Sequence, residues 1–330
     1  MSTSTLVYVE RRGGILVRLA DFVELTKPRI AVLVLVTVAV AAFVAGWGPP
    51  NPLLLFNALL GTTLVAASAS ALNQWLERDS DALMRRTADR PLPAGRLAST
   101  EVLLFSAATI GLGTVYLALA VNWRTAALGL CTWFVYVWIY TPLKTRTSAN
   151  TAVGAVAGAL PVLMGWASVG APLGLKAFTL FLIVFLWQFP HFMAIAWIYR
   201  HQYAAAGLQM LPVVDPSGHR AGVQAVLSAL ILVPVSLVPA VLELAGGTYF
   251  GWALVLGLGQ LACAAAFLWR LDEMSARRLL RASLIYLPAV LLALVLGPLT
   301  HTHNNTHTHN NTTPANLPAG SQLVSQSPPV

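Results

Sequence analysis

Nine apolar segments, each close to the length of a membrane-spanning helix, constrain what this chain can fold into. A helix needs about 20 mostly apolar residues to cross the hydrocarbon core of a bilayer. The segments cover residues 30–46, 53–73, 101–121, 126–141, 152–171, 177–199, 221–244, 250–270 and 282–299. This pattern predicts an all-α, polytopic membrane protein with nine transmembrane helices.

The composition excludes most other classes of protein. The 330 residues are 57% hydrophobic and only 10% charged, whereas an average soluble domain carries about 25% charged residues. A soluble enzyme, a disordered protein and a nucleic-acid-binding domain are therefore disfavoured. The net charge of +8 is more typical of membrane orientation than of nucleic-acid binding. The only cysteines, Cys131 and Cys263, lie in separate apolar runs and form neither a disulfide framework nor a zinc motif.

Charge is distributed unequally between the two sides of the predicted bundle. Of the 20 lysines and arginines, 18 precede the first apolar run or follow an even-numbered one, and the other side has only Arg124 and Lys176. Basic loops stay in the cytoplasm, so we expect a plasma (inner) membrane protein with a cytoplasmic N-terminus and an external C-terminus. Ten of the 12 acidic residues fall on the basic side, with Glu101 and Glu243 as the exceptions. Polar chemistry is therefore expected at the cytoplasmic face.

The two ends of the chain differ from the apolar middle. Residues 1–29 contain no small-residue cleavage site, which predicts a cytoplasmic segment followed by a retained helix and not a signal peptide. Residues 30–299 form the predicted membrane domain. Residues 300–330 are rich in His, Asn and Thr and have no periodicity, which is typical of a disordered tail. Metal binding by its histidines is the alternative interpretation.

The densest polar cluster follows the second apolar run. Asn73, Glu77 and Asp81 are four residues apart, so they share one face if the helix continues beyond the membrane surface. Oxygen ligands on one face suit Mg²⁺, which binds a few carboxylates together with phosphate oxygens. Arginines that pair with phosphate follow at Arg85, Arg86 and Arg90. The pattern favours a diphosphate site with Mg²⁺, but a solvated helix end with an Asp81–Arg85 ion pair also fits it.

A second cluster, Tyr140 to Asn150, ends the fourth apolar run on the same side. Pro142 is expected to stop the regular helix there, and Lys144 can reach back toward the membrane surface. By itself this segment is also typical of an ordinary cytoplasmic loop.

A third cluster lies inside the sixth apolar run, where Pro190 and His191 stand next to each other. The proline is expected to kink the helix. An ionisable side chain within the membrane is a functional candidate, so His191 is a heme ligand, a general base or a neutral residue bonded across helices. A second polar loop follows, with Tyr199, Gln202 and Tyr203.

These motifs together resemble the protoheme IX farnesyltransferases (heme O synthases), a branch of the UbiA-type intramembrane prenyltransferase superfamily. The resemblance runs from about residue 22 to residue 290. It rests on the segments 25–29, 73–93, 140–144, 158–166, 187–192, 206–212 and 276–286. Glu77 and the Pro190-His191-Phe192 sequence look like the heme branch, since quinone and chlorophyll branches usually have Asp at the position of Glu77.

The resemblance implies a reaction and a set of roles. A farnesyl group would pass from farnesyl diphosphate to a vinyl group of protoheme IX (heme b), with addition of water, giving heme O and diphosphate. The helices would surround a central cavity that opens at the cytoplasmic face. The implied catalytic residues are Asn73, Glu77, Asp81, Lys144 and Tyr140, the first three as Mg²⁺ ligands. The implied diphosphate-binding residues are Arg85, Arg86, Arg90 and Lys144, and His191 would bind or position heme. Heme-modifying enzymes and terminal oxidase assemblies are the candidate protein partners.

One position departs from the family pattern. Related sequences usually carry an acidic residue before the tyrosine of the second polar loop, whereas this chain has Gln202 before Tyr203. Gln202 offers an amide oxygen but no charge, which weakens the case for a second Mg²⁺ at this loop.

Two other functions share some of these features. A prenyltransferase with a quinone-precursor acceptor predicts the same metal site without heme binding. A transporter of a lipid phosphate would bind the same diphosphate without chemistry. Transporters often carry inverted repeats and polar groups at the midplane, whereas this chain shows no clear repeat and its charges lie at one face.

Overall fold

A computed structural model describes residues 14–308, with side chains as far as Leu296, and the regular structure of that part is entirely helical. Nine helical spans in the described part are long and apolar enough to cross a membrane, which confirms the predicted fold class. The spans are α2 (Pro28–Ala45), α3 (Pro52–Ala82), α4 (Ser99–Ala120), α5 to α6 (Trp123–Leu143), α7 (Asn150–Ser168), α8 (Leu175–Ile198), α11 (His219–Val241), α12 (Gly247–Arg270) and α13 (Glu273–Thr308).

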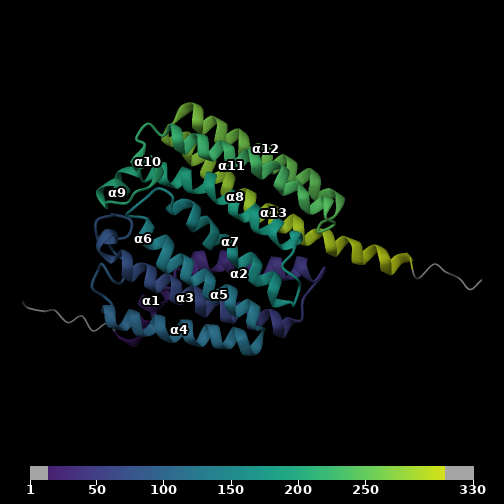
Figure 1. Cartoon of the computed structure of the whole chain (residues 1–330), viewed down its shortest axis with the longest axis horizontal. Coiled ribbons are helices and arrows are strands. Elements are labelled where there is room, and N and C mark those ends of the chain that lie inside the picture. The colour runs from purple at the N-terminus through teal and green to yellow at the C-terminus, as the bar shows by residue number, and fades with distance from the viewer. Residues whose placement is uncertain (1–13, 309–330) are drawn as a thin grey trace, which may run out of the picture.

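The spans form two packed groups (Figure 1). Helices α8, α11, α12 and α13 pack together in one group, and α2, α3, α4, α5 and α7 form the other. Helices α7 and α8 join the groups through their buried faces. Three short helices lie at one end of the bundle: α6 (Thr141–Leu143), α9 (Arg200–Ala205) and α10 (Leu211–Val214).

Polar residues between the apolar runs define where spans begin. The Asn51 side chain accepts hydrogen bonds from Leu53 N at 2.9 Å and Leu54 N at 3.2 Å, and Pro52 occupies the first helical position. Asn122 caps α5 in the same way, through Thr125 N at 2.9 Å. These side chains satisfy backbone N–H groups that have no partner within the helix.

Large apolar side chains on the outside of the bundle are widely exposed. Leu104 is 72% exposed, Leu119 83% and Trp269 91%. Exposure on this scale is unfavourable in water and is expected for surfaces in contact with lipid.

The fourth span changes its winding near its end. Residues Val135–Tyr140 form a π-helical segment, η1, which continues into α6 through Pro142. The hydroxyl of Thr141 donates to the carbonyl of Tyr136 at 2.9 Å. The helix thus continues through Pro142 and ends at Leu143, one residue beyond the predicted stop. Such π segments are often found at functional sites.

The N-terminal segment contains a helix that the apolar pattern did not predict. Helix α1 (Ile15–Leu25) is too short to span a membrane. Its side chains Ile15 and Leu16 are both 82% exposed, while Asp21 and Leu25 are buried against the bundle. An exposed apolar face on a short helix is typical of the membrane interface.

Two expectations from the sequence need correction. Glu101 was assigned to the side opposite the basic loops, but it begins α4 and pairs with Arg18 of α1. It therefore lies on the basic side, because a residue at the start of an apolar run stays with the preceding loop. The tail expected to be disordered from residue 300 begins as helix, since α13 continues to Thr308. Once a helix is established, each added residue gains a hydrogen bond. Residues 309–330 lie outside the described part.

Candidate functional site

The end of α3 carries the predicted oxygen ligands into the protein interior. This helix runs nine residues past its predicted end at residue 73 and finishes at Ala82. Asn73 is fully buried and Asp81 is 1% exposed, and the Glu77 side chain is 12% exposed. The continuous helix puts these three side chains on one face, as their four-residue spacing predicts.

Lys27 enters this site from the junction of α1 and α2, and sequence reasoning missed it. Its ammonium donates to Asn73 Oδ1 at 2.5 Å, and Asn73 Nδ2 donates to the Thr141 hydroxyl at 3.0 Å. Lys27 has φ 52°, in the left-handed region that non-glycine residues rarely adopt. Such strained backbone is often found at functional sites. Lys27 lies in the segment 25–29, on which the family resemblance partly rests, and this position could have marked it as a site residue.

The environment of Lys27 disfavours its charge. The residue as a whole is only partly buried, but its charged end is surrounded by protein atoms. Burial lowers the pKa of Lys27 to about 7, with the charge of Arg90 acting in the same direction and the Glu77 carboxylate opposing it.

The environment of Lys144, in contrast to that of Lys27, favours the charged form. Its ammonium lies 2.6 Å from Glu77 Oε1 and 4.6 Å from the centre of the Tyr140 ring. Burial disfavours the ammonium, but the Glu77 carboxylate together with Tyr140 and Tyr136 outweighs burial and raises the pKa of Lys144 above its ordinary value. Tyr140 packs on Tyr136, with ring centres 5.4 Å apart. The η1 and α6 segments thus place Lys144 and both tyrosines beside Glu77.

The predicted arginines divide into two that join the site and one that does not. Arg90 Nη1 pairs with Asp81 Oδ2 at 2.6 Å. Arg86 donates to the Tyr203 hydroxyl at 3.3 Å and lies 4.9 Å from the centre of the Tyr199 ring. Arg85 is exposed and makes no recorded ion pair or hydrogen bond within the described residues. The pairing expected between Asp81 and Arg85 is made by Arg90 instead, because the chain turns after α3 and brings Arg90 back.

The second polar loop is a short helix with a tyrosine at its start. Tyr199 caps α9, and Gln202 and Tyr203 lie within it. Gln202 Oε1 is buried without a hydrogen-bond partner among the described residues. The structure therefore leaves the role of this amide oxygen a prediction.

His191 lies apart from these residues. Its Nδ1 is 2.9 Å from the Ser283 hydroxyl of α13, and its ring stacks on Trp187 at 5.0 Å. The Trp187 indole donates to the Ser283 carbonyl at 2.7 Å. His191 thus joins α8 to α13, and its role toward heme stays a prediction.

The donor set at the end of α3 fits Mg²⁺ only in partnership with a ligand. The described residues contain no group of three or more His, Cys, Asp or Glu side chains that could hold a metal ion. Glu77 and Asp81 are two carboxylates, with the Asn73 amide as third oxygen donor. Mg²⁺ is commonly bound by one or two carboxylates together with phosphate oxygens and water. The chemistry of the donor set therefore suits a metal that arrives with a diphosphate.

Charge in the site also favours an anion. Three basic side chains, those of Lys27, Arg90 and Lys144, lie with the carboxylates of Glu77 and Asp81, and the exposed Arg86 adds a fourth at the edge of the cluster. The excess of cations in a buried place is costly unless an anionic group compensates it.

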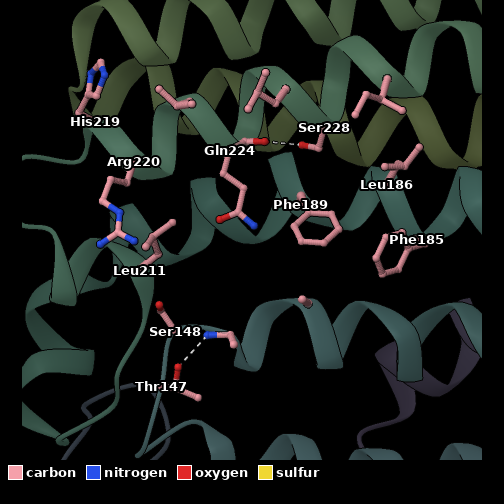
Figure 2. Close-up of a pocket in the computed structure, with 15 residues that line it drawn as sticks. Thr147, Ser148, Phe185, Leu186, Phe189, Leu211, His219, Arg220, Gln224 and Ser228 are labelled. Atoms are coloured by element: carbon pink, nitrogen blue, oxygen red, sulfur yellow. Dashed lines mark hydrogen bonds between the residues drawn. The ribbon is translucent and has the colours of Figure 1, made fainter.

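A cavity of about 820 Å³ lies outside this cluster, between α7, α8 and α11 (Figure 2). Its wall includes Thr147 and Ser148 of the loop that follows Lys144. Between α2, α7, α8 and α13 the structure has a small void of about 10 Å³. The central cavity expected at the cytoplasmic face stays a prediction.

Comparison with known proteins places this geometry in a family. The profile of the UbiA prenyltransferase family matches residues 34–287. The chain belongs to this UbiA prenyltransferase family. The protoheme IX farnesyltransferase of Solibacter usitatus is 43% identical over 282 residues, which cover 82% of this chain and 96% of that protein. The protoheme IX farnesyltransferase of Myxococcus xanthus is 43% identical over 280 residues, covering 84% and 94%.

Solved structures share the fold of this UbiA prenyltransferase. A structure of digeranylgeranylglyceryl phosphate synthase has a TM-score of 0.72 at 17% identity and covers 86% of this chain and 99% of its own. A UbiA homologue from Archaeoglobus fulgidus bound to DMAPP and Mg²⁺ has a TM-score of 0.61 at 17% identity, covering 83% and 99%. At this identity the likeness concerns the fold alone. With nine apolar spans, the protein is an integral membrane prenyltransferase.

Proposed function

We propose that this enzyme transfers a farnesyl group from farnesyl diphosphate to a vinyl group of protoheme IX, with addition of water, giving heme O and diphosphate. The observation that carries the proposal is 43% identity to protoheme IX farnesyltransferases over nearly their whole length. The cluster around Glu77 and Lys144 supports it, because it offers oxygen donors and excess cations to a diphosphate.

The basic side chains bind and orient the leaving group. Lys27, Arg86, Arg90 and Lys144 exchange their present partners for diphosphate oxygens. Breaking the allylic C–O bond leaves its electron pair on the diphosphate, and fixed cations lower the free energy of that state. Arg85, being exposed, would join only after a rearrangement of the segment that follows α3.

Asn73, Glu77 and Asp81 are the residues that would hold Mg²⁺. When bound, the ion supplies positive charge to the leaving diphosphate. The Archaeoglobus homologue bound to DMAPP and Mg²⁺ supports the use of the metal, and the donor set supports these residues as its ligands. Gln202 adds no charge at the second polar segment, so one metal ion is the simpler expectation.

A half-buried aromatic wall protects the allylic cation. Tyr136 and Tyr140 lie next to the cluster and shield it from water, since early quenching would give farnesol. The vinyl carbon forms the new bond to farnesyl C1. A water molecule then adds to the resulting cation next to the porphyrin and loses a proton, which completes the hydroxyethyl-farnesyl substituent.

We also infer that the end of the bundle carrying this cluster faces the cytoplasm. The basic residues gather at that end, and the described exceptions, Arg124 and Lys176, begin spans at the other end. The positive-inside rule then orients the bundle.

Mass analysis of product hemes tests the proposed reaction. Purified protein in lipid nanodiscs receives Mg²⁺, protoheme and farnesyl diphosphate, with the Glu77→Gln variant and an Arg277→Gln surface control run in parallel. Heme heavier by one hydroxyfarnesyl unit, formed by the wild type and the control but not by Glu77→Gln, is expected. Unmodified heme together with a farnesylated quinone precursor would overturn the heme assignment. Binding of both substrates without any transfer would favour a transporter.

A further inference from the structure

The 820 Å³ cavity combines a polar end with an aromatic interior (Figure 2). Arg220 and Gln224 of α11 point into it from one wall, and Ser148 and Thr147 lie across from them. Phe189 and Phe185 of α8 follow further along. Helix α11 begins at His219 and α8 ends at Ile198, at the end of the bundle that carries the Glu77 cluster. The polar end of the cavity lies at this same end. The cavity is therefore amphipathic along the membrane normal.

Arg220 is exposed at the polar end, and no acidic side chain of the described chain lines the cavity beside it. Within the described residues its guanidinium makes no ion pair, and the nearby Asp215 carboxylate accepts from Arg220 N at 2.9 Å and from the Ser217 hydroxyl at 2.6 Å. Arg220 also lies in the first turn of α11, where the helix dipole favours anions over cations. His219, the first residue of α11, lines the same end of the cavity. Arg220 thus provides a cation at the polar end of the cavity, with no ion-pair partner among the described residues.

The two walls offer hydrogen-bond donors to more than one anionic group. Arg220 carries five N–H donors and Gln224 an amide, and the Gln224 side chain makes no recorded hydrogen bond to another described residue. The Ser148 hydroxyl faces them from the loop before α7. A molecule with two separate carboxylates at one edge would use both walls.

The apolar part suits a flat aromatic body. The rings of Phe185 and Phe189 are 5.1 Å apart with an interplanar angle of 80°, so they present a face and an edge to the cavity. Exposed Ala152 and Leu227 leave the cavity open toward lipid. A volume of about 820 Å³ lies within the range of about 300–1,000 Å³ that small-molecule and cofactor sites occupy.

The cavity is linked to the Glu77 cluster through one loop. Thr147 is three residues after Lys144, so their Cα atoms lie within about 11 Å. Asn150 donates to the Thr147 carbonyl at 2.6 Å and to the Gln209 carbonyl at 3.1 Å, and Gln209 N donates to the Lys144 carbonyl at 2.6 Å. These bonds hold the wall of the cavity and the Lys144 segment as one unit.

We propose that this lateral cavity is the docking site of the porphyrin acceptor, which reaches it from the bilayer. The porphyrin's two carboxylates lie on Arg220, Gln224 and Ser148, and its macrocycle lies against Phe185 and Phe189. This inference rests on the proposed function, because it takes protoheme as acceptor. A diacyl phospholipid has one head group and no planar body, so it uses this arrangement less fully.

A thermodynamic cycle tests the contact between Arg220 and the carboxylates. Binding of protoheme and of its dimethyl ester is titrated by absorbance on wild type and on Arg220→Gln in nanodiscs. Charge-assisted hydrogen bonds of this kind are worth about tenfold in affinity. Esterification is expected to cost the wild type about tenfold and Arg220→Gln almost nothing. Equal loss in both proteins would overturn the proposal.

A steric variant makes the test independent of charge. Ala152→Phe fills the cavity from its exposed edge, and Ala108→Phe adds the same ring to a lipid-facing position of α4. Ala152→Phe is expected to raise KM for protoheme about tenfold, with KM for farnesyl diphosphate unchanged, while Ala108→Phe behaves as wild type. A normal KM for protoheme in both Ala152→Phe and Arg220→Gln would overturn the docking site. If these variants still formed farnesylated heme, the proposed function would be unaffected.

Two other results would also overturn the docking site. Loss of protoheme affinity in His191→Ala alone would place the acceptor between α8 and α13. Altered retention of anionic phospholipid by Arg220→Gln, measured by native mass spectrometry without a change in protoheme affinity, would make the cavity a lipid site. Failure of the wild type to bind protoheme, with transfer to a quinone precursor, would remove both the function and the site.

Discussion

Lys144 Nζ lies 2.6 Å from Glu77 Oε1, and the two side chains are only 13% and 12% exposed. A buried ion pair contributes little net stability, because desolvation of both ions offsets their attraction. The pair is better explained by its effect on the charge of Lys144 than by its effect on stability. Under the proposed function, Glu77 keeps Lys144 charged beside the place where a diphosphate would bind, and both side chains would be available to the ligand.

Glu77→Gln is therefore expected to lower turnover by about 100-fold or more, the loss typical when charge stabilisation of a transition state is removed. It also leaves the Lys144 ammonium without its counter-ion, which destabilises the fold. The double variant Glu77→Gln/Lys144→Gln should recover thermal stability without recovering activity. Heme O formation and thermal unfolding in detergent measure the two effects separately. Near-normal turnover of Glu77→Gln and of Asp81→Asn would remove the metal assignment.

Lys27→Met is expected to raise KM for farnesyl diphosphate about tenfold, because it removes an ammonium that now donates to Asn73 Oδ1 at 2.5 Å. KM for protoheme should change less than twofold. Arg29→Met is the matched control, since Arg29 is exposed two residues further on. Steady-state kinetics with each substrate varied in turn would distinguish the effects. Equal effects of both variants on KM would show that only local charge matters.

The spans were predictable because lipid imposes one length on all of them. The prediction of 53–73 missed the end of α3, since a hydropathy pattern does not follow a helix into the polar region where Glu77 and Asp81 lie. The four-residue spacing still predicted their common face. Helix α1 was missed because its 11 residues are too few for a span and its apolar face becomes visible only in the folded chain.

Contacts between distant segments were beyond sequence reasoning. Lys27 meets Asn73 across 46 residues, and one sequence cannot show which basic residue crosses that distance. The sequence around Arg220 is typical of an ordinary loop, and only the packing of α11 on α8 places this arginine in the same cavity as Phe189. His191 was singled out as intramembrane, but its Ser283 partner comes from α13, 92 residues away.

Arg96→Ala is expected to release α1 from the bundle. Arg96 Nη1 pairs with Asp21 Oδ1 at 2.5 Å and Nη2 with Glu24 Oε2 at 2.7 Å, and Asp21 is only 4% exposed. Removing the arginine leaves a buried carboxylate without a partner, which is strongly unfavourable. Amides of residues 15–25 should exchange hydrogen faster, as followed by mass spectrometry.

Arg78→Ala is the control for this experiment, since Arg78 is a half-exposed cytoplasmic-side arginine whose ion pair with Asp79 is at the surface. Because α1 ends two residues before Lys27, release of α1 should also raise KM for farnesyl diphosphate. Unchanged exchange over residues 15–25 in Arg96→Ala would mean that Leu25 and Gln74, whose amide donates to the Leu25 carbonyl at 2.7 Å, hold α1 without the ion pairs.

Orientation in the membrane can be measured with single cysteines in a Cys131→Ser/Cys263→Ser background. Pro216→Cys lies in the loop before α11, and Leu173→Cys lies in the loop between α7 and α8, at opposite ends of the bundle. An impermeant maleimide added to intact spheroplasts is expected to label Leu173→Cys only, because the basic end is cytoplasmic. Labelling of Pro216→Cys alone would place the Glu77 cluster outside.

Gly165→Ala is expected to loosen the contact between α2 and α7, which carries the packing beneath the site. A Cβ at Gly165 would overlap the Val38 carbonyl of α2, and backbone cannot yield as a flexible side chain can. Small residues let membrane helices approach closely in this way. Forcing a methyl group into such a contact costs about 1–3 kcal/mol.

Gly111→Ala is the control, because a Cβ there meets nothing within 4 Å and alanine favours a helix over glycine. Thermal unfolding should show Gly165→Ala destabilised and Gly111→Ala equal to the wild type or more stable. Equal stability of both variants would show that α2 shifts to accommodate the methyl group, and the distance between Lys27 and Asn73 would then be adjustable.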